Sequence, residues 1–111
     1  MVAVAQFIPA DPDQKASVLA VLREHPEMAA MIVRASEKTG DIFAKYRITL
    51  DTRQYDDWDP PVRMLVWVDE PWEAFKADVE RFTHWLAHDA SHDRKLLFIM
   101  PMWDGPLETA P

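Results

Sequence analysis

The histidines of the C-terminal half are the residues of this sequence whose spacing suits chemistry best. His84, His88 and His92 follow one another at intervals of four residues. Because residues i and i+4 share one face of a helix, two of these imidazoles can reach a single divalent ion, and Glu80 extends the row. The segment HWLAHDASH is not an HExxH motif, because no glutamate follows His84 to act as a general base. The pattern therefore indicates either a metal site of His84, His88 and His92 or, as the favoured interpretation, a solvated helix face.

Other patterns of reactive residue types fail on geometry. Residues 91–93 read Ser-His-Asp, but a hydrolase triad needs side chains that converge from separate segments. The acidic loop at 51–61 does not match an EF-hand, because Asp56 stands where glycine is required and Val62 where glutamate is required. No glycine-rich phosphate loop is present in the sequence. Without a convergent catalytic set, a non-enzymatic role is favoured over an enzyme, and no cofactor is expected.

An aromatic and acidic loop is the best candidate for a binding surface. The connection at 51–61 reads DTRQYDDWDPP, which is longer and more acidic than a tight hairpin turn. Tyrosine and tryptophan rimmed by charge are typical of interface hot spots. The alternative is that both rings fold back on the edge of the domain. We predict that a protein partner is contacted by Tyr55, Asp56, Asp57, Trp58 and Asp59.

Composition narrows the class of partner. The chain has 111 residues, a formal net charge of −7, 49% hydrophobic residues and no cysteine. The negative charge argues against nucleic-acid binding, which depends on phosphate neutralisation by Lys and Arg. It allows a basic protein partner, or it serves solubility alone. Because the sequence holds no membrane-length apolar run and no convincing signal peptide, we expect a cytoplasmic protein without a membrane partner.

The central unit of the predicted fold reads as strand, helix and strand. The two strands, at 62–68 and 95–102, are apolar on both sides, which is typical of a sheet covered on both faces. The helix between them covers 71–89, so the strands are expected to be parallel neighbours. Their second face is expected to carry an apolar patch, which either the N-terminal helices or another chain must cover. That patch is formed by Leu65, Trp67, Leu97 and Ile99, with Lys45 and Arg47 nearby.

The long helix carries one narrow apolar stripe. Asp69 or Glu70 is expected to cap it, with Pro71 in its first turn. Trp85 lies on the flank of the stripe and is expected to be half exposed. The stripe, which should pack on the sheet, is formed by Trp72, Phe75, Val79, Phe82 and Leu86. The opposite, solvent-facing row is formed by Glu73, Ala77, Glu80, His84 and His88.

Two shorter helices are predicted before this unit. The first has Asp11 as its cap and Pro12 at its first position, and it ends before Pro26. The second begins at Pro26 and ends at Gly40, or alternatively Ser36 caps a further short turn. One face of this second helix is formed by Met28, Met31, Ile32 and Ala35, which we interpret as adaptable core.

An edge strand and two terminal segments complete the prediction. Residues 44–50 alternate cleanly, so we expect an edge strand antiparallel to 62–68. Residues 1–10 are interpreted as an extended arm or a further edge strand, and 104–111 as a frayed tail. The whole chain is predicted to be a single α+β domain. It has two N-terminal helices and then β-β-α-β, with a small three-stranded mixed sheet packed on a long helix.

Several segments together resemble a group of small acidic bacterial proteins. They are HPEMAAMIV at 25–33, FAKYRITLDT at 43–52, VRMLVWVDEPWEAFKADVERF at 62–82, WL at 85–86 and KLLFIM at 95–100. Where that group has an acidic run before Trp-Leu, this chain has Thr83 and His84. The resemblance implies a fold pattern and no activity. In size and charge the chain is also similar to antitoxins and immunity proteins, which is an analogy only. Together these features favour a protein-binding module, as a homodimer or as the partner of a basic protein.

Overall fold

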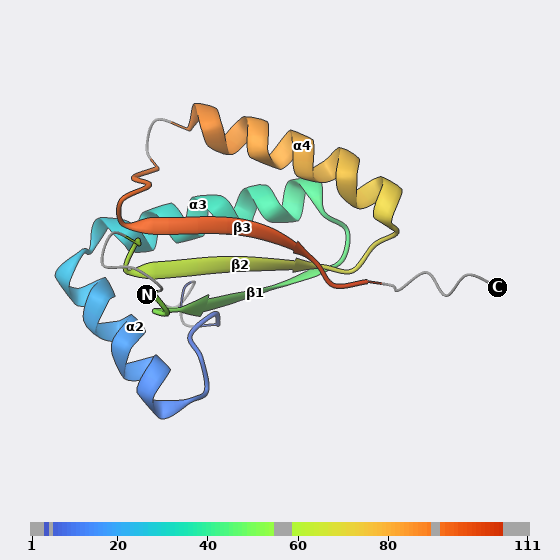
Figure 1. Cartoon of the computed structure of the whole chain (residues 1–111). Helices are drawn as coiled ribbons and strands as arrows, with labels where there is room; N and C mark the ends of the chain where they lie inside the picture. Colours follow the sequence, from blue (N-terminus) through green and yellow to red (C-terminus); the bar gives the residue numbers. More distant parts are fainter. Residues whose placement is uncertain (1–3, 5, 55–58, 90–91, 106–111) are drawn as a thin grey trace.

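The order of helices and strands is the predicted one. A computed structural model describes residues 4, 6–54, 59–89 and 92–105. Within them, two helices precede a β-β-α-β unit, which confirms the α+β class (Figure 1). The elements are α2 (Pro12–Glu24), α3 (Glu27–Ile42), β1 (Tyr46–Asp51), β2 (Val62–Val68), α4 (Trp72–His88) and β3 (Leu97–Trp103). The sheet order is β1-β2-β3, with β1 antiparallel and β3 parallel to β2, as predicted.

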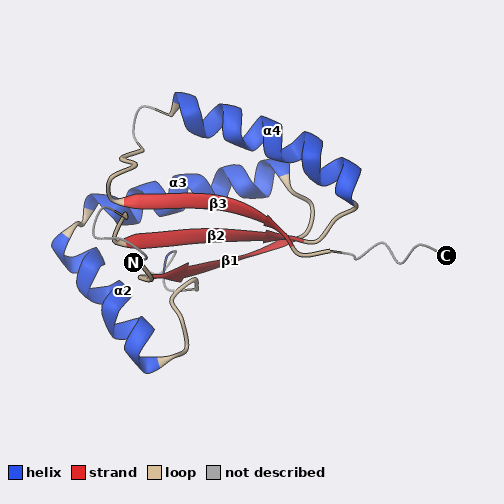
Figure 2. Ribbon diagram, in the orientation of Figure 1, coloured by secondary structure: helices blue, strands red, loops and turns tan. Residues whose placement is uncertain are grey.

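The two faces of the sheet differ in what covers them. Figure 2 shows α3 and α4 on the same side of the sheet, and none of the three described helices α2, α3 and α4 lies over the opposite side. We call the helix-covered side the inner face. Its side chains are almost fully buried and comprise Ile48, Leu50, Val62, Met64, Val66, Val68, Leu97 and Ile99. They form the hydrophobic core together with the apolar sides of the helices. Of the two alternatives for the second face of the sheet, cover by the N-terminal helices is therefore wrong; we call this opposite side the outer face.

The N-terminal helices begin where the sequence indicates. Asp11 caps α2 by accepting a hydrogen bond at 3.0 Å from the backbone N–H of Gln14, and Pro12 takes the first position. His25 ends the helix before Pro26. The buried side chains of α3 are Met28, Met31, Ile32, Ala35 and Thr39, so the methionine-rich face is core, as interpreted.

The end of α3 differs from both predicted alternatives, since the helix runs through Ser36 and Gly40 to Ile42. The Ser36 hydroxyl donates to the Val33 carbonyl inside the helix and caps no new turn. A Cβ atom at position 40 would lie 3.0 Å from the Tyr46 hydroxyl, so glycine here permits the close approach of Tyr46. The glycine thus serves packing within the helix and does not terminate it.

The start of α4 also departs from the sequence-based prediction. The helix begins at Trp72, and its N-cap residue Pro71 makes no side-chain capping bond. Asp69 instead pairs with Lys45 at 2.9 Å. Trp72 is 41% exposed and lies outside the core, where its ring packs against that of Trp103 with ring centroids 5.2 Å apart. From Phe75 onward the stripe packs on the core, and the opposite row is exposed, both as predicted.

The described residues near the two chain ends contact the core and the sheet but form no additional strand. Residues 6–10 form a turn and bends without a strand, while Val4 is buried in the core and Phe7 packs against it. At the other end, the backbone N–H of Asp104 donates to the Val68 carbonyl at 2.8 Å, and residues 106–111 lie outside the described part. No helix in the described part is long and apolar enough to cross a membrane.

Candidate functional site

The outer face is an apolar surface that the helices of this chain leave open. Its central residue, Leu65, is 8% exposed, while Phe98 is 39% and Met100 is 44% exposed. Trp67 and Met102 are half-buried beside them. Large exposed apolar side chains that lie next to one another on one face of a sheet are typical of an interaction surface.

The residues of this face differ in part from the predicted set. The parallel pairing of β2 and β3 matches Val62 with Leu97 and Met64 with Ile99. Leu97 and Ile99 therefore lie on the inner face, and their assignment to the outer face is wrong. A shift of one residue in strand register moves every side chain to the other face, and this register depends on contacts between segments distant in sequence. On β3, the outer face carries Phe98 and Met100 in place of the predicted Leu97 and Ile99.

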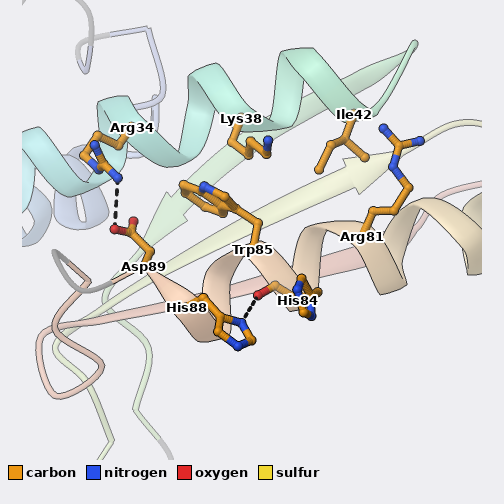
Figure 3. Close-up of a pocket in the computed structure, with 8 residues that line it drawn as sticks. All are labelled: Arg34, Lys38, Ile42, Arg81, His84, Trp85, His88 and Asp89. Atoms are coloured by element: carbon orange, nitrogen blue, oxygen red, sulfur yellow. Dashed lines mark hydrogen bonds and ion pairs between the residues drawn. The ribbon is translucent and has the colours of Figure 1, made fainter.

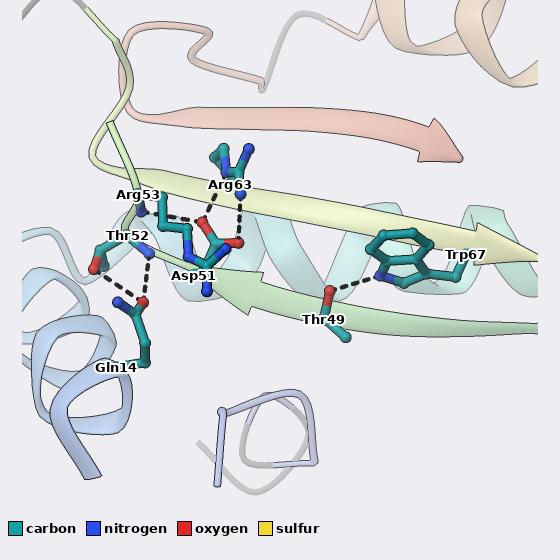
Figure 4. Close-up of polar contacts among 7 residues, drawn as sticks. All are labelled: Gln14, Thr49, Asp51, Thr52, Arg53, Arg63 and Trp67. Carbon is teal, nitrogen blue, oxygen red and sulfur yellow. Dashed lines mark hydrogen bonds and ion pairs between the residues drawn. The ribbon is translucent and has the colours of Figure 1, made fainter. Parts of the chain in front are cut away.

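Trp67 is held on the outer face by contacts with neighbouring side chains. Its indole N–H donates a hydrogen bond of 2.8 Å to the Thr49 hydroxyl on β1 (Figure 4). The Arg47 guanidinium lies over the ring, 4.9 Å from its centroid, and also pairs with Asp104 at 3.8 Å. A fixed aromatic side chain loses little conformational freedom when a partner binds.

A two-bond ion pair closes one end of this face. Arg63 donates to Asp51 from Nε at 2.7 Å and from a terminal nitrogen at 2.8 Å (Figure 4). Burial acts to raise the pKa of Asp51, but hydrogen bonds from Arg63 and from the backbone N–H of Arg53 outweigh it and hold that pKa below its ordinary value. The pair is compensated within the chain, so it contributes no net charge to the face.

The predicted partner-binding loop adjoins the outer face where it is described. Tyr55, Asp56, Asp57 and Trp58 lie outside the described residues. Asp59 is half-buried, and its carbonyl accepts a hydrogen bond of 2.7 Å from Gln54. It lines a cavity of about 220 Å³ together with Pro60, Arg63 and Phe98. The C-terminal end of the loop therefore continues the apolar surface.

The three histidines do not meet in one site. The rings of His84 and His88 are neighbours, with centroids 4.4 Å apart, and both are exposed on α4, as the favoured interpretation expects. His88 Nδ1 lies 2.8 Å from the His84 carbonyl, and because a carbonyl oxygen only accepts, Nδ1 is the donor of this hydrogen bond. His92 lines a different groove, between α4 and β3, and its Nε2 donates to the Leu97 carbonyl at 2.7 Å. Among the described residues, no group of three or more His, Cys, Asp or Glu side chains is arranged to hold a metal ion.

One titratable group stands out that the sequence did not indicate. Glu70 is 9% exposed, and desolvation together with a hydrogen bond to Asp78 raises the pKa of Glu70 to about 7. Its Oε1 atom has no hydrogen-bond partner within the described part of the chain. The residue types around Glu70 predict only a possible helix cap, because burial of its carboxyl group depends on contacts with residues distant in the sequence.

Comparison with protein-family models, with curated proteins and with solved structures gives no match to this chain. The surface chemistry of the chain itself is therefore the basis for a functional assignment.

Proposed function

We propose that this protein is a non-enzymatic binding module that forms a homodimer through its outer face. The observation that carries the proposal is the exposure of Phe98 and Met100 on a sheet face that none of the described helices covers. Burial of apolar surface contributes about 25 cal/mol per Å², so association of two such faces is favourable.

Charge compensation favours a second copy over a basic partner on this face. The two arginines of the outer face already have acidic partners: Arg63 pairs with Asp51, and Arg47 pairs with Asp104. Within the described part of the chain, the carboxylates of Asp51 and Asp104 are therefore already engaged and offer little to a basic protein. Two identical faces can meet without local repulsion, and such a self-complementary contact generates a closed dimer with two-fold symmetry.

The size of the face sets the expected affinity. Three strands spaced about 4.8 Å apart, two of them with seven residues of about 3.3 Å rise and β1 with six, give a face of roughly 14 by 23 Å. This is less than half of the ~800 Å² per partner of a standard interface. We therefore expect a reversible dimer that dissociates at micromolar concentrations and draws on the rim, including Asp59, for further contact.

The test is sedimentation velocity over a concentration series, with native mass spectrometry of the same samples. Met100→Lys places a charge on the face beside its central residue Leu65, and Ala77→Lys places the same charge on the exposed side of α4. Both substitutions change the net charge from −7 to −6, that is −7 plus one. We expect the unmodified chain and Ala77→Lys to dimerise at tens of micromolar, and Met100→Lys to remain monomeric. A monomer at every concentration, or equal dimerisation of all three proteins, would overturn the proposal.

A further inference from the structure

A groove between α3 and α4 gathers cationic side chains around a tryptophan (Figure 3). It has a volume of about 740 Å³, and its lining includes Arg34 and Lys38 from α3 and Arg81, His84 and Trp85 from α4. Cavities that bind small molecules in proteins commonly measure about 300–1,000 Å³. The groove lies on the helix side of the molecule and is therefore separate from the outer face.

The charge of the lining is opposite to that of the chain. Arg34, Lys38 and Arg81 give +3 and Asp89 gives −1, so the lining sums to +2 with both imidazoles neutral. The whole chain carries −7. At physiological salt, charges separated by more than about 8 Å are largely screened from one another. The positive lining of the groove therefore attracts anions locally, although the chain as a whole is acidic.

Each cation retains capacity for a ligand. Arg34 uses one terminal nitrogen on Asp89, at 2.9 Å. Arg81 uses one terminal nitrogen on Asp78, at 3.1 Å. Because a guanidinium has five N–H donors, both can donate further bonds to a phosphate or a carboxylate. Lys38 makes no ion pair within the described ranges and lies 6.0 Å from the centroid of the Trp85 ring.

Trp85 gives the groove an apolar wall of defined shape. The indole is half-buried, and its inner edge packs on Phe82 with ring centroids 5.9 Å apart. Figure 3 shows the ring between Arg34 and Asp89 at one end of the groove and Ile42 and Arg81 at the other. A half-buried indole next to cations suits a ligand that has both a flat ring and a negative charge.

We propose that the α3–α4 groove binds an organic anion that combines a planar ring with a phosphate or carboxylate group. The ring stacks on Trp85, and Lys38 with one of the two arginines holds the anionic group. Positions 34 and 42 are eight residues apart on α3, which places the ends of the groove about 12 Å from each other. This length accommodates a ring and an anionic group side by side.

The test is isothermal titration calorimetry of the full chain with four probes, in the presence of EDTA so that no metal bridges His84 and His88. Adenosine 5′-monophosphate and 1-naphthoate combine a ring with a phosphate or a carboxylate. Adenosine has the ring alone and inorganic phosphate the anion alone. We expect at least one of the combined probes to bind tenfold or more tightly than either partial probe, and the tighter of the two identifies the anionic group. If no probe binds at millimolar concentration, or inorganic phosphate alone binds as tightly as the combined probes, the proposal is overturned.

Two variants with the same change in charge locate the site. Lys38→Gln removes the unpaired ammonium of the groove, and Lys95→Gln removes an exposed ammonium before β3. Loss of a charge-assisted hydrogen bond costs roughly tenfold or more in affinity, so we expect that loss for Lys38→Gln and an unchanged affinity for Lys95→Gln. Equal affinities of the two variants would place binding elsewhere and overturn the assignment. Lys38 makes no ion pair with the described residues and lies 6.0 Å from the centroid of the Trp85 ring, so its replacement should change the melting temperature little.

Discussion

Glu70 is the single residue whose surroundings most change its chemistry. Its carboxyl group is buried beside Asp78, and Asp78 in turn accepts a hydrogen bond from Arg81. The Trp103 indole N–H donates to the Glu70 carbonyl at 2.9 Å, which holds the backbone at this point. With its pKa raised to about 7, the group is protonated in the folded chain over a range in which the unfolded chain has released the proton.

We predict that Glu70 makes the folded state less stable as the pH rises from about 4.5 to about 7. In that window the native state binds one more proton than the unfolded state, so the free energy of unfolding falls with pH, by at most about 1.4 kcal/mol per pH unit. Glu70→Gln, which mimics the protonated acid, should flatten this dependence and melt at a higher temperature than the unmodified chain at pH 8.

Thermal melting followed by circular dichroism between pH 4.5 and 8 measures this effect. Glu73→Gln is the matched control, because Glu73 lies exposed in the first turn of α4 and forms an ion pair with Lys76 on the surface. The control should retain the full pH dependence. The same slope in both variants would show that Glu70 titrates normally. Asp51 does not interfere, because its lowered pKa confines its contribution to more acidic conditions.

At the scale of elements, the sequence predicted those helix and strand boundaries that depend on neighbouring residues in the chain. The two-sided apolar run gave β2 its bounds of 62–68, and Asp11 with Pro12 placed the start of α2. The end of α3 could not be predicted, because the helix continues through Gly40, where the glycine permits the close approach of Tyr46 from the next element. The face of β3 also could not be predicted, because its register is set by pairing with β2 across more than thirty residues of chain.

The stripe of α4 provides the prediction at this scale. Phe82 is fully buried, and its ring lies 5.7 Å from that of Phe43. Phe82→Ala should therefore lower the free energy of unfolding by about 3–5 kcal/mol. Trp72→Ala, on the same stripe but 41% exposed, should cost less than half as much although it removes a larger side chain. Urea denaturation measures both, and equal losses would contradict the observed placement of the core.

At the scale of the whole molecule, electrostatics acts in opposite directions on the two proposed surfaces: it opposes dimerisation through the outer face and favours anion binding in the groove. Self-association brings together two chains of −7 each, through a face whose own charges are compensated. The groove instead attracts an anion with a local charge of the opposite sign. Added salt screens both effects. It should therefore strengthen the dimer and weaken binding of the anion, so the two proposals predict salt effects of opposite sign on one chain.

The size of the effect on the dimer follows from the repulsion. Two point charges of −7 about 25 Å apart in water repel by roughly 3.5 kcal/mol when the Debye length is ~30 Å, and by less than 1 kcal/mol when it is ~8 Å. We expect the dimer to become at least tenfold tighter between 10 and 150 mM NaCl, measured by sedimentation velocity. Ala77→Lys, with one negative charge fewer, should show a smaller gain. A dimer weakened by salt would mean that ion pairs hold it together, so the apolar outer face would not be its interface.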